Sequence, residues 1–136
     1  MKEKINKSEN EWKEILSEEQ FEICRNKSTE APFTGEYYNT KDNGTYKCIC
    51  CDNNLFKSGT KFDSGTGWPS FFEPYNDDSI RYEIDQTLGM TRTEVLCKIC
   101  NSHLGHVFND GPEPSFKRYC INSRSLKFVE SINSIK

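Results

Sequence analysis

Two Cys-x-x-Cys pairs constrain the fold of this chain more than any other feature. Cys48 and Cys51 form the first pair, and Cys97 and Cys100 form the second. A two-residue gap lets both sulfur atoms of a pair point at one ion, and two such pairs complete a tetrahedral site of four thiolates. Because a closed site of this kind leaves no position for a substrate, it indicates architecture rather than catalysis. We therefore predict a structural Zn²⁺ site at these four cysteines.

Two alternatives stay open for the cysteines. The segment between the pairs is longer than in a usual zinc ribbon, so each pair could instead form a redox-active dithiol. Cys50 lies inside the first pair and could compete for the metal, but the spacing favours Cys48 and Cys51. We expect Cys50 to be a surface or packing thiol. A stoichiometric metal that resists peroxide would exclude working Cys-x-x-Cys disulfides.

Charge and hydropathy exclude several classes of function. The net charge of −3 comes with no basic stripe, so neither nucleic acid nor an anionic membrane is an expected partner. No apolar run approaches the roughly 20 residues of a membrane span, and the first residues lack the apolar core of a signal peptide. Seven cysteines without such a signal fit a reducing compartment. We expect a cytoplasmic monomer, unless an organelle-targeting segment has been removed.

Two capping boxes predict short helices near the start of the chain. Ser8 is followed three residues later by a glutamate, and Ser17 is followed by a glutamine at the same spacing. Trp12, Ile15 and Leu16 would share one face of the first helix. We expect this N-terminal helical segment, residues 1–31, to pack on the rest of the domain.

From residue 32 onward the pattern changes to short strands and loops rich in glycine and proline. Two aromatic runs around Asn43-Gly44 predict a β-hairpin. Further strands are expected at residues 80–85, 91–98, 106–110, 117–122 and 126–130. We therefore predict a mainly β domain over residues 32–130, with a frayed tail at 131–136.

Cys120 lies in the stretch "KRYCIN", which alternates like a strand. Tyr119 and Ile121 would face the core, while Arg118, Cys120 and Asn122 would face the opposite side. A nearby guanidinium favours the thiolate over the thiol, and the thiolate is the nucleophile. The alternative is a solvated strand face with an incidental cysteine.

The protein has only two histidines, His103 and His106, three residues apart across a glycine turn. Two imidazoles on one turn could supply a general acid or a proton relay near neutral pH. They could also be metal ligands, although four thiolates already complete a zinc site. Trp68 lies between a glycine and a proline. An indole fixed in such a loop can contact a small apolar or polarised methyl group, or it can plug the core beneath the loop.

Several long motifs, in order along the chain, resemble the methionine-(R)-sulfoxide reductases, the MsrB family. They are "APFTGEYYNTKDNGTYKCICCDNNLF", "KFDSGTGWPSFFEP", "GMTRTEVLCKICNSHLGHVFNDGPEPS" and "KRYCINSRSLKF". The resemblance implies two small antiparallel sheets flanked by short N-terminal helices, with zinc away from the active site. It also implies reduction of the R epimer of methionine sulfoxide, mainly in proteins or peptides, through a sulfenic acid at the catalytic cysteine.

The same resemblance implies roles for individual residues. Cys120 falls at the nucleophile, and the four paired cysteines fall at the metal ligands. The remaining assignments are a substrate contact at Trp68 and Phe71 in "GWPSF", and a polar shell of His103, His106, Arg118 and Asn122, with Asp110 behind it.

One departure from the family pattern affects the reductant. Many members carry a resolving cysteine where this chain has Thr66, which leaves Cys24 or Cys50 to resolve Cys120. The alternative is that an external thiol attacks the sulfenic acid directly, which makes glutathione or a glutaredoxin plausible beside thioredoxin. Two rival functions are a non-catalytic zinc-binding module of similar fold and a thiol–disulfide oxidoreductase that uses its Cys-x-x-Cys pairs.

Overall fold

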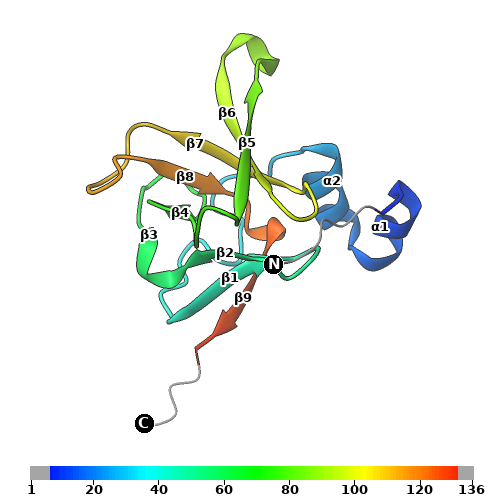
Figure 1. Ribbon diagram of the computed structural model, residues 1–136, viewed down its shortest axis with the longest axis horizontal. Helices are drawn as coiled ribbons and strands as arrows, with labels where there is room; N and C mark the ends of the chain where they lie inside the picture. The colour runs from blue at the N-terminus through cyan, green and yellow to red at the C-terminus, as the bar shows by residue number, and fades with distance from the viewer. Residues whose placement is uncertain (1–6, 132–136) are drawn as a thin grey trace.

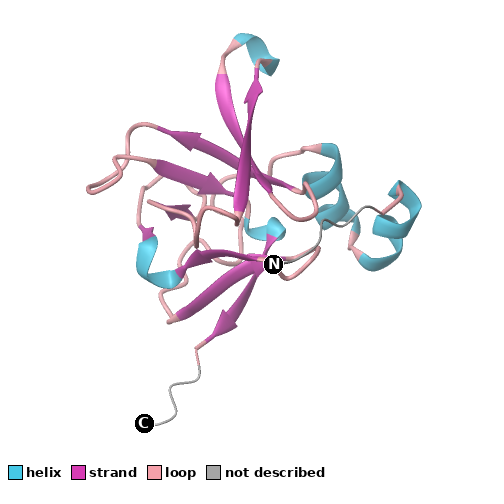
Figure 2. Ribbon diagram, in the orientation of Figure 1, coloured by secondary structure: helices cyan, strands magenta, loops and turns pink. Residues whose placement is uncertain are grey.

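The computed structural model describes residues 7–131 and consists of two antiparallel sheets with two helices at the N-terminal side (Figures 1 and 2). The helices are α1, Glu9–Ile15, and α2, Glu18–Asn26. One sheet has the order β2-β1-β9, with β1 at Gly44–Cys48, β2 at Asn54–Lys57 and β9 at Leu126–Glu130. The other has the order β3-β4-β8-β7-β6-β5. Its strands are β3 Lys61–Phe62, β4 Ser70–Phe71, β5 Ile80–Asp85, β6 Arg92–Cys97, β7 His103–Phe108 and β8 Arg118–Ile121. The predicted fold class is confirmed.

Both predicted capping boxes are present. The Ser8 hydroxyl accepts from the Glu11 backbone N–H at the start of α1, and Ser17 does the same for Gln20 at the start of α2. The shared apolar face predicted for α1 is only partly correct, because Trp12 is buried but Ile15 is 57% exposed. No helix within residues 7–131 is long and apolar enough to cross a membrane. The frayed tail expected from residue 131 lies, apart from that residue, outside the described range.

The hairpin predicted around Asn43-Gly44 is wrong. Residues 36–39 form turns, and β1 pairs instead with β2 and with β9. A Cβ atom on Gly44 would lie 2.3 Å from the Val129 carbonyl oxygen, so this glycine allows a close approach of β9 rather than a tight turn. Tyr37, expected on a strand, packs edge-on against Tyr46 from its turn, with 5.6 Å between ring centres.

An aromatic core joins the two sheets. Phe56 of β2 stacks on Phe71 of β4 with ring centres 4.4 Å apart, and Tyr46 of β1 meets the same Phe71 edge-on at 5.1 Å. All three side chains are fully buried. Aromatic pairs in these geometries add about 0.5–1.5 kcal/mol each to the burial of their area. The core therefore fixes β4, and with it the loop that precedes β4, against the smaller sheet.

β7 and β8 bring the histidines to the cysteine. His106 and Cys120 are direct partners in the β7–β8 ladder, so their side chains lie on one face. Both histidines lie on β7: His106 was expected on a strand at 106–110, whereas the strand begins earlier, at His103, where a turn was expected. Gly105 is present because a Cβ atom there would lie 2.0 Å from the Cys120 carbonyl oxygen.

We predict that Gly105→Ala destabilises the protein by about 1–3 kcal/mol, because the added methyl group would force β7 and β8 apart. The free energy of unfolding from urea denaturation measures the effect. Gly59→Ala is the matched control, since nothing lies within 4 Å of a Cβ atom at that position. Equal stability of the two variants would contradict the close approach of these strands.

Candidate functional site

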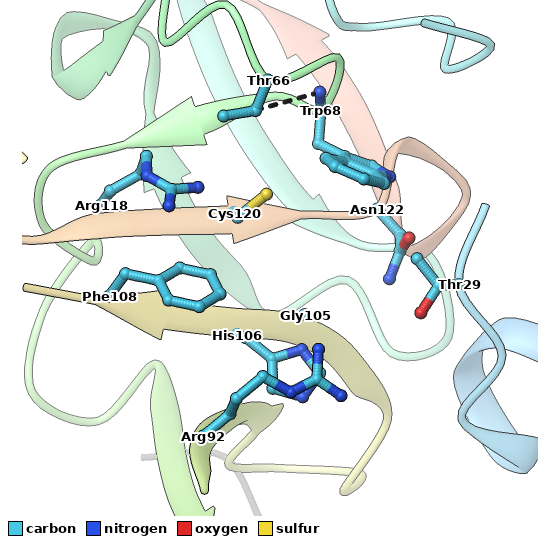
Figure 3. A pocket seen from close by; sticks show the side chains of 10 residues that line it. All are labelled: Thr29, Thr66, Trp68, Arg92, Gly105, His106, Phe108, Arg118, Cys120 and Asn122. Atoms are coloured by element: carbon cyan, nitrogen blue, oxygen red, sulfur yellow. Dashed lines mark hydrogen bonds between the residues drawn. The ribbon is translucent and has the colours of Figure 1, made fainter. Parts of the chain in front are cut away.

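A cavity of about 260 Å³ opens beside Cys120 on the six-stranded sheet (Figure 3). Strands β7 and β8 form its floor, and the loop before β4 supplies Thr66 and Trp68 on one side. The lining consists of Thr29, Thr66, Trp68, Arg92, Gly105, His106, Phe108, Arg118, Cys120 and Asn122. Five of the residues singled out from the sequence are therefore brought together around one space: Trp68, His106, Arg118, Cys120 and Asn122.

Burial dominates the electrostatics of Cys120. Desolvation raises the pKa of this half-buried thiol above its ordinary value. The positive charge of Arg118 lowers the pKa, as do hydrogen bonds from Thr66 and Arg118, but together they do not overcome the burial. The guanidinium acts in the direction expected from the sequence. The effect of Arg118 on the pKa is smaller than the effect of burial, so Cys120 is predominantly a thiol at neutral pH.

Arg118 is held in place from two sides. Its Nε and Nη2 atoms donate to the two carboxylate oxygens of Asp110 at 2.9 and 3.0 Å. The guanidinium carbon lies 4.4 Å from the centre of the Phe108 ring. Asp110 raises the pKa of Arg118, while Arg118 lowers the pKa of Asp110. A two-point contact of this kind fixes the plane of the guanidinium beside the cavity.

His106 is held by the carboxylate of Asp85, the last residue of β5 before the β5–β6 connection. Its Nε2 lies 2.7 Å from Asp85 Oδ2, and Arg92 Nη2 donates to the same oxygen at 3.2 Å. Hydrogen bonds from Thr87, followed by the one from His106, hold the pKa of Asp85 far below its usual value. Because an ionised carboxylate only accepts hydrogen bonds, Nε2 carries the ring proton in this contact.

His103 lies beside His106 but does not line the cavity. The two ring centres are 5.5 Å apart, and His103 is only 2% exposed. Its Nδ1 is 2.7 Å from Glu94 Oε2, whereas its Nε2 is buried with no hydrogen-bond partner. Burial lowers the pKa of His103, although the hydrogen bond to Glu94 raises it. An unpartnered buried ring nitrogen is uncommon in a folded protein and calls for a functional explanation.

The segment after α2 forms part of the same site. The Glu30 backbone N–H donates to Asn122 Oδ1 at 3.1 Å, and Trp68 Nε1 donates to the Glu30 carbonyl oxygen at 3.0 Å. Asn122 Nδ2 in turn donates to the Leu104 carbonyl oxygen at 3.1 Å. Thr29 lines the cavity next to these contacts. The site thus draws residues from both sides of the boundary expected at residue 31.

Phe71 and Cys24, which were also singled out from the sequence, do not line the cavity. Phe71 is fully buried in the aromatic core, so its position does not support the expected substrate contact. Cys24 is 2% exposed, and its Sγ lies 3.8 Å from Ser125 Oγ beneath α2. Neither side chain therefore faces the space beside Cys120.

The four paired cysteines meet at one point away from this cavity. All four sulfur atoms lie within 4.8 Å of one another, and the Cys48–Cys100 and Cys51–Cys97 contacts are each 3.6 Å. A tetrahedral ion with metal–sulfur bonds of about 2.3 Å needs sulfur atoms at nearly this spacing. The cluster is therefore compatible with a metal ion.

The two cysteine turns have the same construction. The N–H groups of Asp52 and Asn101 donate to the carbonyl oxygens of Cys48 and Cys97, each at 2.9 Å. Asp52 and Asn101 both have left-handed backbone conformations, with φ of 65° and 64°. Asn and Asp are the non-glycine residues most tolerant of that conformation. The repeated pattern Cys-x-x-Cys-Asp/Asn is therefore the local signal for these two turns.

Sequence reasoning missed several residues of the site: Thr29, Asp85, Arg92, Glu94 and Phe108. Alternation along the predicted strand at 91–98 could have placed Arg92 and Glu94 on one face. It could not identify His103 as the partner of Glu94, because the β6–β7 register contains an irregularity between Val95 and Leu96.

Comparison with known proteins covers nearly the whole chain. A family model described as the SelR domain matches residues 16–130. The chain is 54% identical over 125 residues to a peptide methionine sulfoxide reductase MsrB of Hahella chejuensis (strain KCTC 2396), which spans 92% of this chain and 90% of that protein. It is 52% identical over 128 residues to the MsrB of Herminiimonas arsenicoxydans, spanning 94% and 93%. It is also 56% identical over 125 residues to the chloroplastic peptide methionine sulfoxide reductase B1 of Oryza sativa subsp. japonica, spanning 91% of this chain and 58% of that one. The matched range includes the cavity residues and all four clustered cysteines.

We predict that Arg118→Met slows alkylation of Cys120 by iodoacetamide at pH 8. Arg118 lowers the pKa of Cys120, so its removal raises that pKa further and reduces the thiolate fraction. Mass spectrometry of the Cys120 peptide against time and pH measures the rate. Arg81→Met, which removes a guanidinium paired with Glu83 on β5, should leave the rate unchanged. A faster reaction in Arg118→Met would contradict the assigned direction.

Proposed function

This chain belongs to the SelR-domain family of peptide methionine sulfoxide reductases, and on that premise we propose that Cys120 is the nucleophile that reduces methionine-(R)-sulfoxide in oxidised proteins and peptides. The protein is an oxidoreductase that reduces methionine sulfoxide. The observation that carries the proposal is the position of Cys120 in a cavity between Trp68 and His106. A volume of about 260 Å³ is below the roughly 300–1,000 Å³ of most small-molecule pockets, which suits a single side chain.

The proposed chemistry begins with the Cys120 thiol. A neighbouring base takes the thiol proton, and the thiolate attacks the sulfoxide sulfur. The S–S bond formed by this attack then breaks together with the S=O bond, as the oxygen is transferred with one proton to the Cys120 sulfur; this leaves a sulfenic acid on Cys120 and releases methionine. The methionine sulfur is thereby reduced by two electrons, and the Cys120 sulfur is oxidised by two.

The residues around Cys120 support this sequence of events. His106 is its partner across the ladder and lines the cavity, so we assign it the proton transfer between the thiol and the sulfoxide oxygen. Arg118 stabilises the developing thiolate from the position that Asp110 fixes. Trp68 provides an apolar surface for the substrate methyl group, with its indole oriented by the Glu30 carbonyl. Asn122 positions the cavity wall, because both ends of its amide are bonded to backbone.

For the second half of the reaction we propose an external thiol. The sulfenic acid would react with that thiol to give a mixed disulfide and water, and a second thiol would release Cys120. Thr66, at the position where many relatives carry a resolving cysteine, lines the cavity and lowers the pKa of the Cys120 thiol instead. The burial of Cys24 disfavours a direct role for it, so glutathione, a glutaredoxin or thioredoxin would act on Cys120 itself.

The four clustered cysteines would hold a structural Zn²⁺. Sulfur atoms alone fit a soft, tetrahedral ion, and their mutual distances match such a site. Asn53 Nδ2 lies 3.7 Å from Cys97 Sγ, and Ser102 Oγ lies 3.1 Å from Cys100 Sγ, so polar groups also stabilise the sulfur atoms. When bound, the ion supplies folding free energy rather than a reaction step. This use of both pairs disfavours the thiol–disulfide alternative, and family membership disfavours a non-catalytic zinc module.

The wild-type protein should reduce only the R epimer of a peptide methionine sulfoxide with dithiothreitol, and Cys120→Ser should abolish turnover. Separate assays of the R and S epimers by chromatography measure this. Cys24→Ser and Cys50→Ser should retain turnover with dithiothreitol and with thioredoxin or glutaredoxin. Turnover of R by Cys120→Ser would remove Cys120 from the proposed role, and its loss in Cys24→Ser with thioredoxin alone would make Cys24 the resolving residue.

The purified protein should contain one zinc ion per chain, measured by elemental mass spectrometry. Cys100→Ser should lose the ion and more than about 4 kcal/mol of the free energy of unfolding, because loss of a structural metal is among the largest single-site effects. Cys50→Ser is the control within the same turn and should keep the ion. A chain that is fully folded after exhaustive chelation would overturn the structural role of the metal.

A further inference from the structure

The cationic end of α2 approaches the buried side of the histidine pair. Lys27 Nζ donates to Glu94 Oε1 at 3.1 Å, and the other oxygen of the same carboxylate accepts from His103 Nδ1 at 2.7 Å. The side chains of Glu94 and His103 are 5% and 3% exposed, whereas that of Lys27 is 55% exposed. One carboxylate therefore bridges a half-exposed cation and a buried imidazole.

The conformation of Lys27 is well defined although its side chain reaches solvent. Lys27 caps α2 in a left-handed conformation with φ of 63°, and its backbone N–H donates to the Glu22 carbonyl oxygen. Arg25 Nη1 donates to the Cys100 carbonyl oxygen at 2.9 Å and anchors this end of α2 to the second cysteine turn. The ammonium group is thus directed to Glu94 by the helix end and not by a flexible loop.

We propose that Lys27 is a positioning residue that acts through Glu94 to keep His103 neutral, with its Nε2 free to accept a hydrogen bond beside the cavity. This inference deepens the function proposed above, on which it rests. It makes the N-terminal helix part of the electrostatics of the reaction centre. His103 is then a neutral neighbour of His106, with ring centres 5.5 Å apart, while His106 lines the cavity.

The charge balance gives the physical reason. With His103 neutral, the negative charge of Glu94 is compensated by Lys27, so the buried cluster carries no net charge. Without Lys27, the buried carboxylate would have only His103 to compensate it, and a proton would be drawn onto the imidazole. In agreement, the charge of Lys27 lowers the pKa of His103, while Glu94 raises it.

Other charged groups near the cluster are already paired. Glu83 lies opposite Glu94 in the β5–β6 ladder and is bonded to Arg81. His106, on the same strand as His103, is bonded to Asp85. Among the described residues, these contacts leave Lys27 as the cation bonded to the carboxylate that holds His103.

The test is a titration of the two imidazoles by NMR, with the His103 signal assigned from a His106→Asn variant. Lys27→Met should shift the titration midpoint of His103 to higher pH, and Lys27→Arg should restore the wild-type midpoint. Glu94→Gln should shift it the opposite way, to lower pH. Lys13→Met is the matched control, because it removes the same charge from α1, where Lys13 pairs with Glu9. Circular dichroism establishes that each variant is folded.

The pH dependence of the kinetics should shift in the same direction as the titration midpoint of His103. If neutral His103 is the working form, the acid limb of kcat for the R-sulfoxide peptide should move to higher pH in Lys27→Met, with KM little changed. An unchanged His103 midpoint in folded Lys27→Met, or an equal shift in Lys13→Met, would overturn the proposal. Because the titration needs no substrate, that failure would leave the proposed reductase mechanism intact, whereas absence of R-epimer turnover in the wild type would reject the mechanism itself.

Discussion

The meeting of four sulfur atoms from two separate turns determines how the two sheets sit against each other. One turn joins β1 to β2 in the three-stranded sheet, and the other joins β6 to β7 in the six-stranded sheet. Four thiolates at these distances repel one another unless a cation or protons intervene, so the cluster is a demanding contact to form. Once formed, it fixes the β6–β7 hairpin, and β7 begins only three residues after Cys100. The histidines are thus positioned by the cysteine turn that precedes them.

Burial is the dominant influence on the ionisable groups of the site, and paired charges correct for it. Desolvation raises the pKa of Cys120 and lowers the pKa of His103. Both shifts favour the neutral form of the group. A carboxylate contributes to the surroundings of each group. Asp110 orients Arg118 beside the Cys120 thiol, and Glu94 binds the His103 imidazole directly. In the proposed mechanism the resting cavity therefore holds an unreactive thiol. The thiolate forms when the substrate places its oxygen where the proton can be received.

Some of this arrangement could be predicted from the sequence because it follows from local chemistry. The capping boxes, the two cysteine turns and the alternation that places Arg118, Cys120 and Asn122 on one face depend only on residues close together in the chain. The failures have a common cause. The sequence predicted a strand at residues 36–39, but β1 pairs with β2 and β9 instead. Phe71 was expected to contact the substrate, but it packs in a core formed by both sheets. In each case, contacts with a segment distant in the sequence outweighed the conformation or role that the local sequence favoured.

By itself the sequence determined the family, the four-cysteine cluster and the face of β8 on which the Cys120 thiol lies, since spacing and periodicity are properties of a short stretch. Only the tertiary structure decided which carboxylate binds which histidine, that Thr29 and the Glu30 backbone complete the cavity, and that burial outweighs Arg118 at Cys120. The physical reason is that pairing and desolvation depend on neighbours that are remote in the chain. Those neighbours exist only after β5 to β8 have aligned and α2 has packed against β7.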